Sequence, residues 1–266
     1  MSTSATSSSR SSPGPEVSDL LALYDQHERF AATYPDTRRE ELPHLVRHVD
    51  LVGHSGTVIF SRLLAESADA AIAEQCAYFQ SLGQEFEWKA FAHDQPADLV
   101  ERLAARGFDV DETEAIMVLD LHDPPAALLA PTPNVKRLHQ LDELRDVSAV
   151  KQQTGDDAIV ARLAYEMEHA PDYLSVYMAY ADNLPAACGW IRFPETSPFA
   201  SLWGGATVPE HRHRGLYTAL LRARLQEARA RGWQYLTIDA GHMSRPIVEK
   251  RGFRLLTYAT ACNWHG

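Results

Sequence analysis

The chain of 266 residues is 45% hydrophobic, carries a formal net charge of −11 and holds three widely spaced cysteines. This composition allows a buried core in one large domain or two of ordinary size. The negative charge argues against nucleic-acid binding, since phosphate backbones attract a basic face. Without a Cys-x-x-Cys pair the sequence predicts no metal site. A sparse, odd cysteine count is typical of a reducing cytoplasm, and each thiol is expected in the core.

Two segments without regular structure are predicted. Residues 1–15 are rich in Ser, Thr, Pro and Gly, so we expect a disordered tail rather than a signal peptide or a membrane anchor. No segment is apolar over the length that crosses a bilayer, which predicts a cytoplasmic protein without a membrane partner. Four prolines within residues 122–134 indicate a linker over 123–133. The linker separates a first domain, 16–122, from a second, 134–266.

The first domain shows helical and strand-like patterns in alternation. Its expected helices are 17–34, 68–82 and a segment that begins after Pro96, and its expected strands are 45–51, 57–63, 85–93 and 115–121.

The second domain continues in the same manner. Its expected helices are 141–153, 157–169, 215–231 and 245–250, and its expected strands are 135–138, 173–181, 185–193, 199–208, 235–240 and 253–263. The Asp182-Asn183 turn makes 173–181 and 185–193 a hairpin. Along 215–231 the leucines share one face, and the polar side chains, Arg224 among them, are expected on the other.

The two domains contain a glycine, a proline and an Arg-Gly-Phe triplet in the same order. Gly83, Pro96 and Arg106-Gly107-Phe108 correspond to Gly232, Pro246 and Arg251-Gly252-Phe253. This self-similarity predicts a tandem duplication, although an Arg-Gly-Phe stop after a helix is common by itself. The copies differ at one position, where Glu66 in the first copy corresponds to Gly215 in the second. A glutamate repels phosphate, so the first copy is expected to be degenerate.

The segment Val208 to Leu221, VPEHRHRGLYTALL, places a basic turn and a glycine between a strand and a helix. This arrangement offers free backbone N–H groups and the positive end of a helix to an anion. Arginine adds charge-assisted hydrogen bonds, and Thr218 adds a hydroxyl. The spacing is neither G-x-G-x-x-G nor a nucleoside triphosphate loop. The segment therefore predicts a phosphate site of another kind.

The motif resembles the acyl-CoA-binding pattern of the GCN5-related N-acetyltransferase (GNAT) family, Arg/Gln-x-x-Gly-x-Gly/Ala after a strand. Arg212 and Gly215 fit the first two anchors, whereas Tyr217 replaces the usual Gly or Ala. The resemblance covers residues 135–264. It implies an α/β (α+β) protein with two GNAT-like domains, each a mixed, mainly antiparallel twisted sheet flanked by helices. Acetyl-CoA would be the co-substrate, and the acceptor would be the amine of a small molecule or peptide.

The resemblance also implies which residues bind the co-substrate. The backbone that would pair with pantetheine belongs to Ala206, Thr207 and Val208. The N–H groups that would hold the pyrophosphate belong to Arg212, His213, Arg214, Gly215, Leu216, Tyr217 and Thr218.

The catalytic residues are less directly indicated. Asp239 and His242 follow the strand 235–240 on the expected acceptor side, and histidine suits proton removal near neutral pH. A turn-forming aspartate and a surface histidine are the alternatives. The tyrosine that often protonates the thiolate in the family is Val248 here, so that role is not transferred. Tyr217 and Tyr258 are substitutes by residue type alone.

Alternative functions follow from the same residues. A non-catalytic acyl-CoA-binding or protein-interaction module would explain Val248 and Tyr217, and transfer of a longer acyl group or transfer to a hydroxyl is a third possibility. The central-strand aromatics are expected in the core, with some lining the acceptor pocket: Tyr173, Tyr177, Trp190 and Trp203. The duplicated halves pack within one chain or form a homodimer.

Overall fold

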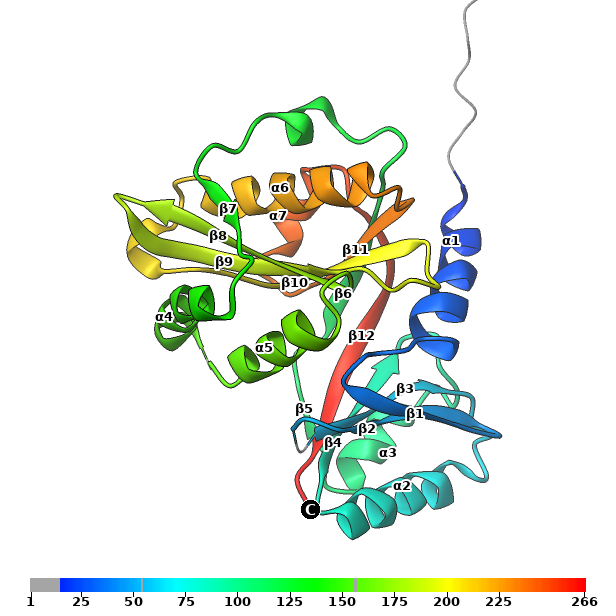
Figure 1. Cartoon of the computed structure of the whole chain (residues 1–266). Helices are drawn as coiled ribbons and strands as arrows, with labels where there is room; N and C mark the ends of the chain where they lie inside the picture. The colour runs from blue at the N-terminus through cyan, green and yellow to red at the C-terminus, as the bar shows by residue number, and fades with distance from the viewer. Residues whose placement is uncertain (1–14, 54, 156) are drawn as a thin grey trace, which may run out of the picture.

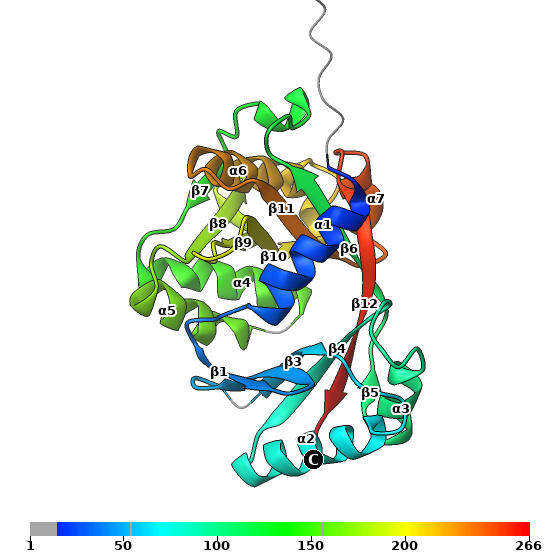
Figure 2. The same ribbon diagram turned by 90° about the vertical axis from the view of Figure 1, so that its right-hand side faces the viewer.

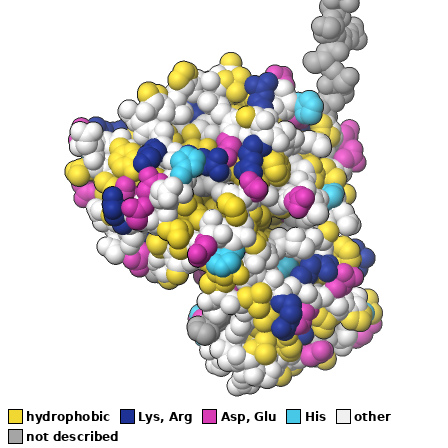
Figure 3. Space-filling model, in the orientation of Figure 1, with side chains coloured by type: hydrophobic (Ala, Val, Ile, Leu, Met, Phe, Trp, Pro, Cys, Tyr) yellow, Lys and Arg dark blue, Asp and Glu magenta, His cyan; other side chains and the backbone are white. Residues whose placement is uncertain are grey.

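The computed structural model describes residues 15–53, 55–155 and 157–266 as two lobes (Figure 1). The predicted tail lies outside the described residues apart from Pro15. The space-filling surface steps inward where the two lobes meet (Figure 3). Among the described helices, none combines the length and the apolar character that a membrane span requires.

The elements alternate along the chain. The first half contains α1 (Val17–Tyr24), the π-helical segment η1 (Asp25–Phe30), β1 (Thr37–Leu42), β2 (Leu45–Asp50), β3 (Ser55–Ser61), α2 (Ala68–Leu82), β4 (Glu85–Phe91), α3 (Leu99–Ala105), β5 (Asp109–Val110) and β6 (Glu114–Asp120). After the 3₁₀ turn η2 (Ala126–Leu129), the second half contains β7 (Val135–Arg137), η3 (Leu141–Glu143), α4 (Leu144–Thr154), α5 (Ile159–His169), β8 (Leu174–Ala181), β9 (Leu184–Arg192), β10 (Phe199–Thr207), η4 (Pro209–His211), α6 (Leu216–Ala230), β11 (Tyr235–Ala240), α7 (Arg245–Glu249) and β12 (Arg254–Trp264).

The expected elements agree with the structure apart from the short elements β5, η2 and η4, which were not expected, and two larger differences. The single helix expected over 17–34 is α1 followed by the π-helical turns of η1. Strand β1 was not predicted, because its sequence TRREEL lacks the alternation of apolar and polar residues that indicates a strand. It lies at one edge of the sheet, and charged side chains are typical of an exposed edge.

One mixed, largely antiparallel sheet runs through both lobes, in the order β1-β2-β3-β4-β12-β6-β11-β10-β9-β8-β7, with β5 beside β12. The predicted fold class is confirmed. In the upper lobe α6 and α7 lie above the sheet and α4 and α5 below it, whereas α2 and α3 flank the lower lobe (Figure 1). All three cysteines are buried, as expected.

The halves exchange their last strands. Strand β6 of the first half lies between β11 and β12 of the second half. Strand β12 pairs with β6 through Arg254–Ala259 and then with β4 through Ala259–Trp264. Figure 2 shows β12 running from the upper lobe into the lower one. The domain boundary at 123–133 stays a prediction, but each half completes its sheet with a strand from the other.

The two halves also repeat one local arrangement. Helices α2 and α6 each have 15 residues and end at a glycine in the left-handed region, Gly83 and Gly232. In each half the strand after that glycine pairs in parallel with the strand before the helix, β3 with β4 and β10 with β11. The duplication itself remains a prediction that these elements support.

The strand exchange predicts that the fragment 15–122 does not fold alone, because β4 would lose its neighbour β12 and expose an open sheet edge. Co-expression with the fragment 123–266 should restore a folded complex. The measurement is size-exclusion chromatography with circular dichroism. A cooperative thermal transition of the isolated fragment would contradict this interpretation.

Candidate functional site

A fork between β10 and β11 forms the centre of the candidate site. The parallel register joins Phe199–Leu202 to Tyr235–Ile238. Beyond Ile238, β11 continues beside β6, and beyond Leu202, β10 continues beside β9. The two strands therefore diverge, and each turns one backbone edge toward the space between them.

A β-bulge in β10 produces the divergence. The register between β9 and β10 shifts between Trp203 and Ala206, and a bulge bends its strand. Gly204 has a φ of +63°, and a Cβ placed there would lie 1.9 Å from the Trp190 ring. Only glycine satisfies both constraints, so this residue fixes the position of the bend.

Arg224 of α6 supports the bulge from the helix side of the sheet. Its guanidinium donates to the carbonyl oxygens of Trp190 (3.0 Å) and Trp203 (3.2 Å), and its side chain is buried at 1% exposure. Gly189 leaves room for it, since a Cβ there would lie 2.9 Å from Nη1. Burial lowers the pKa of the Arg224 guanidinium. The expectation that Arg224 lies on the polar helix face was wrong, because carbonyl groups at the bulge need a long donor.

The basic turn follows the fork and leads into α6. His213 and Gly215 both have left-handed backbone, with φ of +61° and +80°. Ala219 donates the first helical hydrogen bond, to the carbonyl of Gly215. The N–H groups of the residues between them, 216–218, therefore have no intrahelical acceptor and point along the positive end of the helix. This geometry fits an anion.

The basic side chains of the turn are exposed and form only local contacts. Arg212 Nε donates to the Thr207 carbonyl at 3.3 Å. Arg214 contacts Asp182 at 3.2 Å and His211 Nδ1 at 2.9 Å. A phosphate group could thus be reached by Arg212 without breaking a buried interaction.

The predicted catalytic residues are not brought together. Tyr217 packs its ring against Gly205 on the α6 side, and burial raises the pKa of its hydroxyl. His242 is exposed and contacts Glu112 at 3.1 Å. Asp239 is the first residue of β11 beyond the parallel register and forms an ion pair with Lys89 of β4. Of the three, Asp239 lies at the fork.

Val248, Tyr258 and the central aromatics have other surroundings. Val248 is fully buried in the core below α6, and the Tyr258 hydroxyl accepts from Arg245 at 3.1 Å. Among the central aromatics, Tyr177 and Trp190 are buried, whereas Trp203 is 36% exposed at the fork.

Charged residues of the first half were missed as site residues. In β4 the residues Phe86, Trp88 and Ala90 enter the core of the first half, so Glu87 and Lys89 face the opposite way. Lys89 Nζ lies 5.5 Å from the centroid of the Trp203 ring. The alternation in EFEWKAF is the signal that could have identified these two residues.

Lys89 and the carboxyl groups on its face of the sheet are electrostatically coupled. Burial lowers the pKa of Lys89, but the charges of Asp239 and Glu87 outweigh it and raise the pKa overall. Burial raises the pKa of Glu87 and of Glu114, and the charge of Asp239 raises both further. Several carboxyl groups thus share one lysine, as is common at functional sites.

Comparisons with known proteins agree with this geometry. Residues 138–253 match the family model described as the acetyltransferase (GNAT) family. No match was found among curated proteins. A GCN5-related N-acetyltransferase from Kribbella flavida is similar in structure, with a TM-score of 0.69 and 13% identity over 96% of this chain and 97% of that one.

Two further solved structures are similar. One is a putative acetyltransferase of the GNAT family from Novosphingobium aromaticivorans (TM-score 0.55, 18% identity, 82% of this chain and 87% of that one). The other is a tandem GNAT protein from the clavulanic acid biosynthesis pathway (TM-score 0.56, 15% identity, 95% of this chain and 89% of that one). At these identities the likeness shows the fold.

Residues 138–253 thus match the model of the GNAT acetyltransferase family, whose fold supports acyl transfer in general. The likeness to solved GNAT structures extends over both halves of the chain and shows a shared fold.

Replacing Arg224 by Met should lower the free energy of unfolding by about 2–3 kcal/mol, because the Trp190 and Trp203 carbonyls lose a charged donor. Arg229→Met, on the exposed end of the same helix, is the matched control and should change it by less than about 0.5 kcal/mol. Urea denaturation measures both. Equal effects of the two substitutions would show that the bulge does not depend on Arg224.

Proposed function

We propose that this protein is an acetyl-CoA-dependent N-acetyltransferase. It transfers the acetyl group to the amine of a small molecule or peptide by direct attack. The observation that carries the proposal is the fork at Leu202 and Ile238, with the basic turn that precedes α6 following on β10. A strand edge and a helix N-terminus at this spacing fit the two chemically different parts of acetyl-CoA, its amide arm and its phosphates.

Different residues of the chain would bind the pantetheine arm and the pyrophosphate of acetyl-CoA. The edge of β10 at Ala206 and Thr207 faces away from β9 and can pair with the pantetheine amides. The Val208 N–H already donates to the Ala186 carbonyl, so only its carbonyl remains for this role. The N–H groups of the turn and of residues 216–218 would hold the pyrophosphate, with Arg212 adding a charge-assisted bond.

Three elements would contribute to the chemistry at the fork. The thioester carbonyl needs a preorganised N–H donor for the charge that develops on its oxygen, and the bent backbone of β10 offers one. Trp203 and Lys89 form the wall on the side of the first half. The acidic surroundings of Asp239 favour a cationic acceptor, since an amine reaches the site mostly protonated.

Gly215→Glu should weaken acetyl-CoA binding at least tenfold, because a carboxylate would project into the anion site. Gly83→Glu is the matched control: Gly83 also has a left-handed φ, ends a helix and has open space around its Cβ position. Isothermal titration with acetyl-CoA measures both. A wild-type protein that binds no acetyl-CoA would refute the proposed function. Binding without thiol release in the presence of amines would indicate the non-catalytic module instead.

A further inference from the structure

Segment η1 directly follows Tyr24, which packs with Ile116 and Phe199 on one face of the sheet. Asp239 pairs with Ile116 across β11 and β6 and therefore lies on the same face as η1. This inference rests on the proposed function and asks which residue accepts the proton of the amine. The question is open at the fork itself, because Asp239 is already ion-paired with Lys89. A carboxylate held by a cation is a weak proton acceptor.

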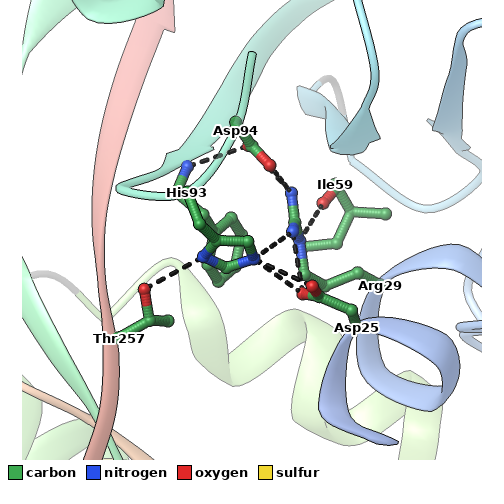
Figure 4. Close-up of polar contacts among 7 residues, drawn as sticks. Asp25, Arg29, Ile59, His93, Asp94 and Thr257 are labelled. Atoms are coloured by element: carbon green, nitrogen blue, oxygen red, sulfur yellow. Dashed lines mark hydrogen bonds and ion pairs between the residues drawn. The ribbon is translucent and has the colours of Figure 1, made fainter. Parts of the chain in front are cut away.

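A buried polar network fixes the orientation of η1 (Figure 4). Arg29, with 1% exposure, donates to both carboxylate oxygens of Asp94 at 2.6 and 2.8 Å and to Asp25 at 2.8 Å. His93 joins the network, with Nε2 2.9 Å from Asp25 and Nδ1 3.1 Å from Thr257 Oγ1. Through these bonds η1 is attached to the end of β4 and to β12.

Glu28 precedes Arg29 and is therefore held in place by the same network. Its carboxylate accepts a hydrogen bond from the Ser197 hydroxyl, just before β10 begins. The charge of Asp239 in β11 acts on Glu28. Burial raises the pKa of the hydroxyls of Tyr24, at the end of α1, and Tyr34, before β1, and the charge of Glu28 raises both further. Glu28 is thus half-buried beside the start of β10, within the electrostatic influence of Asp239.

The surroundings of Glu28 differ from those of the other carboxyl groups. In the described part of the chain no cation forms an ion pair with it, whereas Asp239, Glu87 and Glu114 all experience the charge of Lys89. Burial raises the pKa of Glu28 to about 7, the Ser197 hydrogen bond opposes this rise, and the charge of Asp239 adds to it. A base with a pKa near the operating pH is the most effective proton acceptor.

We propose that Glu28 is the general base of the transfer reaction, supplied by the first half to the site of the second. Its carboxylate takes one proton from the R–NH₃⁺ acceptor, directly or through one water. The nitrogen lone pair then forms the C–N bond to the acetyl carbon, and the C–S bond breaks with its electrons on the CoA sulfur. The second nitrogen proton passes to that thiolate, and Glu28 releases its proton to solvent.

The test compares two nucleophiles at about pH 7.5. n-Butylamine is protonated there and needs a base, whereas hydroxylamine is already neutral. Glu28→Gln should lower kcat/KM for n-butylamine roughly 10²- to 10³-fold and that for hydroxylamine less than tenfold. The acid limb of the wild-type kcat/KM profile, near pH 7, should disappear. Glu74→Gln, on the exposed face of α2, is the matched control and should change neither rate.

A second measurement does not depend on turnover. A carboxyl group with a raised pKa destabilises the folded state once it ionises, so wild-type stability should fall relative to Glu28→Gln as the pH rises from about 4.5 to 7. Urea midpoints at about pH 5 and pH 8 measure this. A constant difference between the two proteins would show that Glu28 does not titrate in this range and would overturn the proposal.

The outcomes separate the two hypotheses. If the wild type binds acetyl-CoA and releases thiol, but Glu28→Gln retains the rate and pH profile with n-butylamine, the assignment of Glu28 fails and the transferase proposal stands. If the wild type binds no acetyl-CoA, both fail. Unchanged acetyl-CoA affinity of Glu28→Gln, together with selective loss toward n-butylamine, supports Glu28 as the base.

Discussion

The hydrogen-bond ladder of β12 is the constraint on which the rest of the structure depends. The strand pairs with β6 at its beginning and with β4 at its end. Because register in a sheet is fixed residue by residue, this single strand sets the position of the lower lobe relative to the upper one. It thereby places Lys89, which pairs with Ala261 in the ladder, within reach of Asp239. Both halves contribute residues to the candidate site because both contribute strands to the one sheet.

The fork depends on a second, local constraint. A bulge in a central strand leaves carbonyl groups without ladder partners, and a buried unpaired carbonyl is costly. Arg224 meets that need from α6, and two glycines, Gly189 and Gly204, provide the space for the guanidinium and for the Trp190 ring. The burial of Arg224 is tolerated because, among the described residues, its donors bind main-chain carbonyl oxygens in place of a carboxylate. The separation of β10 from β11 is thus part of the packed core and not a loose strand end.

On the face of the sheet opposite α6, several carboxyl groups lie close enough to Lys89 to interact with its charge. The carboxyl groups of Asp239, Glu87 and Glu114 surround Lys89, so an incoming ammonium group would meet a region of negative charge. Glu28 lies in the same field but is fixed by its own helix through Arg29 and accepts only a neutral hydroxyl in its described contacts. Under the proposed assignment, the absence of an ion pair among its described contacts distinguishes Glu28 from the carboxylates that neutralise Lys89.

The sequence alone determined the features that depend on near neighbours. The apolar periods predicted most of the helices and strands. The glycine after a basic turn predicted left-handed backbone and a helix start, which are local properties, and the binding of an anion there stays a prediction. Only the tertiary structure decided what meets across long separations. Lys89 and Asp239 are 150 positions apart, and Glu28 and Ser197 are 169 apart. Such pairs follow from the exchange of strands, and the charge of a residue does not reveal which distant strand will lie beside it.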